Sequence, residues 1–168
     1  MGLFKKKVFK LNEQEYGYLL SKMILTSTQS GFSEISDSFN SSNDKIINFL
    51  ELSLHYTYIC ESLLKEKYPS LKVDRCISHT IECLTIQTGA FDNKIDEGAS
   101  ALHDLYSCIK EQEINIFTEE GLHKLTQSYQ DSCGIGYDQL MHLTVFLLMS
   151  NFIIHHTSDV AGEHLRMI

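Results

Sequence analysis

The sequence predicts an all-α protein: a single-domain bundle of about six mostly antiparallel helices, with a short strand or arm at the N-terminus. Apolar residues recur at helical spacing through most of the 168 residues, whereas the alternation typical of a strand is confined to Lys7–Leu11. The segments between the apolar stretches are short, which favours antiparallel neighbours. We therefore expect a basic arm over residues 1–11 and a helical bundle over residues 12–168.

The first predicted helix begins at a capping box, because Asn12 is followed three residues later by Glu15. Helical spacing continues to about Ser30, where Ser30-Gly31 and the Ser/Asn-rich run 36–43 indicate a loop, with at most a short helical turn at Phe32–Ile35.

The second predicted helix covers about Asp44–Lys67 and is apolar on more than one face, which is typical of the central helix of a bundle. Pro69 ends it. The later helices are expected at about 71–88, closed by Gly89; at 93–113; from Thr118 to before Gly134; and at 137–157. We expect the remaining residues to form a tail or a final turn that docks through Leu165, Met167 and Ile168.

The most apolar stretch of the chain is residues 140–154. It is only 15 residues long and includes polar side chains such as His142 and Asn151, whereas a membrane span needs about 20 cleaner residues. We interpret it as a core helix and expect no transmembrane segment.

Charge is distributed unevenly along the chain. The net charge is −8, yet Lys5, Lys6, Lys7 and Lys10 place four positive charges and no acid in the first ten residues. The rest of the chain then has ten basic against 22 acidic residues, a charge of −12. So acidic a body repels phosphate backbones, which argues against a nucleic-acid-binding protein and suits a basic protein partner.

The basic arm is the most distinctive local feature, because apolar residues and lysines alternate in blocks along it. Such a segment can pack on the acidic body of its own chain or of a neighbour, or lie on an anionic membrane, or fray. We favour packing on protein over a peripheral membrane contact, and name as partner-contact residues Lys5, Lys6, Lys7 and Lys10.

The number and spacing of the five cysteines predict the cellular compartment of the protein. An odd number without any CxxC pair, in a chain long enough to have its own core, indicates reduced thiols and hence a cytoplasmic protein.

Two clusters contain residue types that bind metals. Cys76, His79 and Cys83 have i, i+3 and i+7 spacing, so that one helical face presents two thiols and an imidazole suited to zinc or copper. The alternative, which we favour, is that these side chains belong to a packed core face in which the histidine is hydrogen-bonded. A second cluster lies near the C-terminus and consists of His155, His156, Asp159 and Glu163. We interpret it as a histidine-rich helix end exposed to solvent, because histidines are favoured near a helix C-terminus.

Cys133 is the best candidate for a reactive thiol, because it lies in a glycine turn before a helix N-terminus that would favour a thiolate. A Cys–His hydrolase also needs an aligned histidine and an oxyanion hole, for which the local sequence provides no support. The chain has no P-loop, H-E-x-x-H or G-x-S-x-G motif. We therefore name no catalytic residue and no cofactor.

These observations predict a non-enzymatic cytosolic protein that acts by protein–protein interaction, with another protein or with itself. The acidic body and the eight tyrosines favour this function, one version being an inhibitor or immunity-type binder of a basic partner. The alternative is a helical bundle that holds a metal or small ligand between helices through His and Cys side chains.

Overall fold

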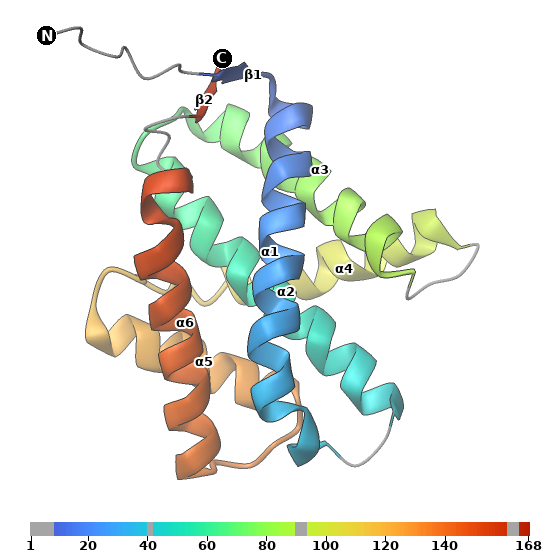
Figure 1. Ribbon diagram of the computed structural model, residues 1–168, viewed down its shortest axis with the longest axis vertical. Helices are drawn as coiled ribbons and strands as arrows, with labels where there is room; N and C mark the ends of the chain where they lie inside the picture. The colour runs from blue at the N-terminus through green and yellow to red at the C-terminus, as the bar shows by residue number, and fades with distance from the viewer. Residues whose placement is uncertain (1–8, 40–41, 90–93, 161–164) are drawn as a thin grey trace, which may run out of the picture.

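The computed structural model describes residues 9–39, 42–89, 94–160 and 165–168, and helices make up most of it (Figure 1). Within these residues the six helices are present, and the all-α bundle is confirmed. The elements in chain order are β1 (Phe9–Leu11), α1 (Glu13–Ile35), the 3₁₀ turn η1 (Ser36–Ser38), α2 (Ser42–Lys65), α3 (Ser70–Thr88), α4 (Ile95–Lys110), α5 (Glu119–Ser132), α6 (Gln139–Val160) and β2 (Leu165–Met167).

The start of α1 is the predicted capping box. The Asn12 side chain accepts a hydrogen bond from the Glu15 amide, and the Glu15 carboxylate accepts one from the Asn12 amide, both at 2.9 Å. The predicted end at Ser30 is wrong, because α1 continues through Gly31 to Ile35. A Cβ on Gly31 would approach the Tyr56 hydroxyl to 3.2 Å, so glycine permits close packing here, and this packing outweighs its low helix propensity.

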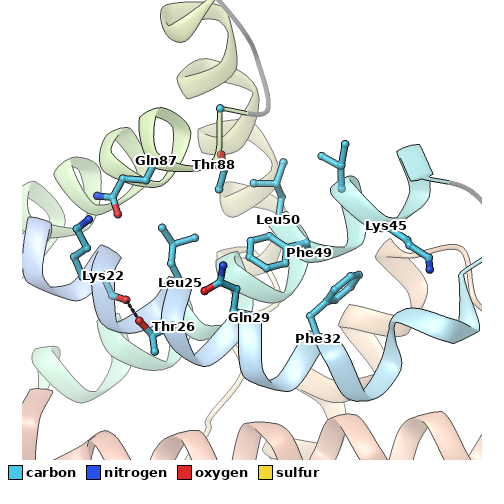
Figure 2. Close-up of a pocket in the computed structure, with 12 residues that line it drawn as sticks. Lys22, Leu25, Thr26, Gln29, Phe32, Lys45, Phe49, Leu50, Gln87 and Thr88 are labelled. Atoms are coloured by element: carbon cyan, nitrogen blue, oxygen red, sulfur yellow. Dashed lines mark hydrogen bonds between the residues drawn. The ribbon is translucent and has the colours of Figure 1, made fainter.

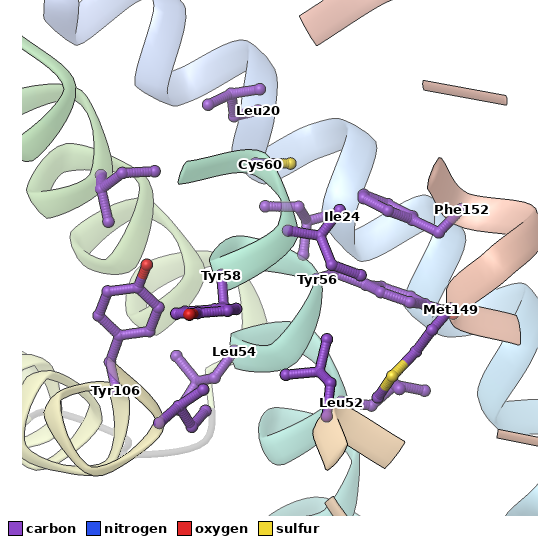
Figure 3. Close-up of a cluster of buried hydrophobic side chains, with 14 of the residues drawn as sticks. Leu20, Ile24, Leu52, Leu54, Tyr56, Tyr58, Cys60, Tyr106, Met149 and Phe152 are labelled. Carbon is purple, nitrogen blue, oxygen red and sulfur yellow. The ribbon is translucent and has the colours of Figure 1, made fainter. Parts of the chain in front are cut away.

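Helix α2 is the centre of the bundle, as its apolar faces predict. Every residue from Leu50 to Glu61 is buried, and α2 packs against α1, α3, α4, α5 and α6. Figure 3 shows its side chains between those of α1, α4 and α6, where the Tyr56 and Phe152 rings stack with their centroids 4.1 Å apart. In Figure 1, α2 runs opposite to both α1 and α3.

Local signals near α3, α4 and α5 are partly confirmed. Gly89 closes α3 with a left-handed φ of 60°, and the Thr118 side chain caps α5 by accepting from the Gly121 amide at 3.0 Å. Helix α4 ends at Lys110, three residues before the predicted end, because Glu113 adopts a left-handed φ of 48° that no helix contains. The predicted start of α4 at Asn93 lies outside the described residues.

Helix α6 is not the core helix that its composition predicts. It lies at the edge of the bundle and buries one face only, formed by Met141, Val145, Met149, Phe152 and Val160. Within the described residues α6 alone is long and apolar enough to cross a bilayer, and 22% of its most apolar stretch is buried. Length and composition are weak evidence for a span, and the described residues contain no clear transmembrane segment.

The two ends of the described chain pair with each other. Strands β1 and β2 run parallel, with Phe9 opposite Leu165, Lys10 opposite Arg166 and Leu11 opposite Met167. The predicted strand at residues 7–11 is therefore present over Phe9–Leu11, and residues 7 and 8 lie outside the described part. The tail docks as expected, since Met167 is buried and the Ile168 amide donates to the Leu11 carbonyl at 2.9 Å.

His55 is a fully buried histidine in the middle of α2. Its Nδ1 lies 2.7 Å from the Glu51 carbonyl and its Nε2 lies 3.3 Å from the Ser128 hydroxyl, so the neutral ring donates at Nδ1 and accepts at Nε2. Burial lowers the pKa of His55 from 6.5 to about 4, although the Glu51 carbonyl opposes this shift.

Acidification is expected to destabilise the protein through His55. The folded-state pKa of His55 lies below the unfolded value, so the protein has its full stability above pH 6.5. Its free energy of unfolding falls by about 3 kcal/mol as the pH decreases from 6.5 through 4, because the unfolded chain binds a proton that the folded chain does not. Urea unfolding at pH 7 and pH 4 should show this loss in the wild type and a smaller one in His55→Asn. The exposed His155→Gln variant is the control and should follow the wild type. An equal loss in His55→Asn would contradict the assignment.

Candidate functional site

Lys10, one of the four predicted partner-contact residues, lies in a cationic cleft. This cleft has a volume of about 690 Å³ and is lined by Lys10, Lys67, Lys72 and Arg166, with no acidic side chain among the described lining residues. Lys5, Lys6 and Lys7 lie outside the described residues. The sequence did not indicate Lys67, Lys72 or Arg166, because only the parallel pairing of β1 with β2 brings the chain ends together.

The structure does not gather Cys76, His79 and Cys83 into a cluster suited to a metal ion. Cys76 is fully buried, and burial raises the pKa of its thiol to about 12. The His79 Nδ1 lies 3.0 Å from the Glu82 carboxylate on the same helix. Within the described residues no group of three or more His, Cys, Asp and Glu side chains could hold a metal ion.

In the second predicted cluster, His156 contacts a neighbouring helix. Its Nε2 lies 3.0 Å from the Ser27 hydroxyl of α1, and its Nδ1 lies 3.7 Å from the Asp159 carboxylate. His155 is exposed beside a small cleft of about 200 Å³ that Ser27 and His156 also line. Glu163 lies outside the described residues.

The order Ser27, His156, Asp159 resembles that of a serine nucleophile with its base and orienting acid. A nucleophile also needs hydrogen-bond donors at the developing oxyanion. Ser27 lies inside α1, and the backbone N–H groups around it are used within that helix. We therefore assign the Ser27–His156 hydrogen bond to the packing of α1 against α6.

Cys133 is not in the environment that the sequence predicts. It is the C-cap of α5, and α6 begins only at Gln139. Burial raises the pKa of the Cys133 thiol to about 12, although a hydrogen bond with Tyr129 opposes this. This direction is opposite to that of a thiolate favoured by a helix N-terminus. The predicted position of Cys133 just before a helix N-terminus is wrong, and its reactivity stays a prediction.

The exposed side of α6 forms an apolar face, which we define by Leu140, Leu143, Leu147 and Ile154. Between 51% and 75% of each of these residues is exposed. Their spacings of three, four and seven residues place them in one stripe along the helix. No Lys, Arg, Asp or Glu occurs from Gln139 to Ser158, so the stripe itself carries no charged side chain, and Glu34 and Asp138 lie beside its Leu140 end.

A groove with a volume of about 860 Å³ lies between α1, α2 and α3. Figure 2 shows apolar side chains from α1 and α2 along it, with Lys22 near one end and Lys45 near the other. We call it the α1–α3 groove. No pattern in the sequence indicates this groove, because its residues come from three helices separated along the chain.

Comparisons with models of known protein families, with curated proteins and with solved structures find no match to this chain. A function is therefore inferred from the molecule's own surfaces. Three of them stand out: the cationic cleft, the apolar face of α6 and the α1–α3 groove.

Proposed function

We propose that this chain is a non-enzymatic helical protein that acts by protein–protein interaction, and that the apolar face of α6 binds a second copy of the chain. The observation that carries the proposal is an exposed helix with 20 consecutive uncharged residues from Gln139 to Ser158. Contiguous exposed apolar surface with few charges is typical of contact sites between proteins. A cytoplasmic location remains part of the proposal, and the five free cysteines support it.

The spacing of the apolar face favours self-association. Leu140, Leu143, Leu147 and Ile154 follow the alternating three- and four-residue steps of a coiled-coil seam, with Ser150 at the remaining step. If two α6 helices pair antiparallel about a two-fold axis at Leu147, Leu140 lies opposite Ile154 of the other copy. Such an interface is isologous, because the same patch serves both partners.

Charge also favours a second copy over a basic partner at this face. Two chains of net charge −8 repel each other, and they do so least where their surfaces carry no carboxylate. A basic partner would need carboxylates at the contact, and the face provides none. The inhibitor-like version suggested by the acidic body therefore applies only to other parts of the surface, where it stays a prediction.

Replacing Leu147 with aspartate is expected to abolish the dimer, because two carboxylates would meet at the two-fold axis. Like charges brought together in an interface cost several kcal/mol, which weakens association about 100-fold or more. Sedimentation equilibrium at micromolar concentrations should give twice 19.2 kDa for the wild type and 19.2 kDa for the variant.

The matched control is Leu71→Asp, because Leu71 is 65% exposed on α3, away from the face. It should remain a dimer, and circular dichroism should show that both variants keep their helices. A wild type of 19.2 kDa, or equal dissociation of the two variants, would contradict the proposal.

A further inference from the structure

The α1–α3 groove combines an apolar wall with cationic ends. The wall consists of Leu25 and Phe32 from α1 and Ile46, Phe49 and Leu50 from α2. The Phe32 and Phe49 rings meet edge to face, with centroids 5.6 Å apart, and Ile46 is half exposed. The volume of about 860 Å³ lies in the range of sites that bind small molecules.

Lys22 and Lys45 are the charged residues among those that line the groove, and no acidic side chain lines it within the described part of the chain. The Lys22 ammonium lies 5.4 Å from the centroid of the Tyr18 ring. In a chain of net charge −8, a groove with two cations and no lining carboxylate attracts anions locally.

Gln87 provides a hydrogen-bond acceptor at the Lys22 end. Its amide nitrogen donates to the Ser21 hydroxyl at 2.9 Å, which holds the side chain beside α1. Its carbonyl oxygen is buried and accepts no hydrogen bond from the described residues. A buried acceptor without a donor is costly, so a ligand that donates a hydrogen bond here is favoured.

We propose that the α1–α3 groove binds an anionic amphiphile: an apolar chain that ends in a carboxylate and carries a hydroxyl or amide donor next to it. The chain lies along the Leu25 and Phe49 side chains and the carboxylate meets the Lys22 ammonium. The donor meets the Gln87 carbonyl oxygen after the Gln87 side chain turns this oxygen toward the groove. Lys45 adds positive charge at the opposite end. This site does not involve α6 and is independent of the proposed dimer.

Isothermal titration calorimetry with three ten-carbon probes, used below their micellar concentrations, tests the proposal. 3-Hydroxydecanoate is expected to bind with one site per chain, decanoate several-fold more weakly, and decyltrimethylammonium not at all. Equal binding of anion and cation, or no binding of either carboxylate, would overturn the proposal. Equal binding of the two carboxylates would overturn the role of Gln87.

The double variant Lys22→Gln/Lys45→Gln is expected to bind 3-hydroxydecanoate at least tenfold more weakly. Lys94→Gln is the matched control, because this lysine is 71% exposed outside the groove and should leave the affinity unchanged. Circular dichroism should verify that both variants are folded. An unchanged affinity in the double variant would overturn the assignment of the anion to these lysines.

Discussion

Replacing Gly121 with alanine is expected to destabilise the protein by about 4 kcal/mol, a large effect for the addition of one methyl group. A Cβ at this position would lie 1.7 Å from the carbonyl oxygen of Asn115. That carbonyl cannot easily retreat, because Ile114 and Ile116 on either side of it are buried in the core. The new methyl group can therefore avoid the Asn115 carbonyl only if core side chains or the first turn of α5 move.

Gly136→Ala provides the control for Gly121→Ala. A Cβ on Gly136 would have no neighbour within 4 Å, and Gly136 does not have a positive φ. The free energy of unfolding of this variant should lie within about 0.5 kcal/mol of the wild-type value, since the added methyl group meets no other atom. Urea unfolding followed by circular dichroism measures both. Equal stabilities of the two variants would show that the loop before α5 adapts without cost.

Glu61→Ala is expected to have the second large effect, lowering the free energy of unfolding by about 4 kcal/mol. Glu61 is 2% exposed on α2 and forms ion pairs with the Lys65 and Lys110 ammonium groups, while the buried Tyr106 hydroxyl donates to it. Burial would raise the pKa of the Glu61 carboxyl, but the bonds from Lys65, Tyr106 and Lys110 outweigh it and the pKa is lowered. Alanine removes the ion pairs and leaves the Tyr106 hydroxyl without its acceptor.

Glu97→Ala is the matched control for Glu61→Ala, because the Lys94–Glu97 pair on the surface is also short, at 2.9 Å. Both of its side chains are more than 70% exposed, and such pairs contribute little, so a change below about 1 kcal/mol is expected.

The dependence on pH provides a second check on Glu61. Because the folded-state pKa of Glu61 is lowered, its carboxylate stabilises the protein at pH values above the unfolded pKa of 4.5. The difference in free energy of unfolding between the wild type and Glu61→Ala should therefore become smaller as the pH falls below 4.5. A gap that stays constant, measured by urea unfolding at pH 7 and pH 3, would contradict the role of the charge.

Sequence alone determined the features that depend on neighbouring residues. The capping box of Asn12 and Glu15, the cap at Thr118 and the end of α3 at Gly89 each depend on residues within about four positions, and each is confirmed. The central place of α2 also follows from the sequence, because a helix that is apolar on several faces must be surrounded.

Expectations failed where packing outweighed a local preference. Gly31 and its polar neighbours indicate a loop, yet α1 continues because the buried Phe32 and Ile35 anchor its last turn. Cys133 was expected just before a helix N-terminus and is instead the half-buried C-cap of α5. The first difference depends on contacts of Phe32 and Ile35 with the rest of the core, which periodicity does not encode.

Only the tertiary structure decided where the candidate surfaces lie. Helix α6 is apolar around most of its circumference, so no polar side marks its exposed face, and the packing of α1, α2 and α5 selects it. Of the candidate site residues, Lys10 follows from the sequence, whereas the nearness of Arg166, Lys67 and Lys72 depends on the pairing of the chain ends. The α1–α3 groove arises in the same way, because its lining residues are neighbours in space and distant along the chain.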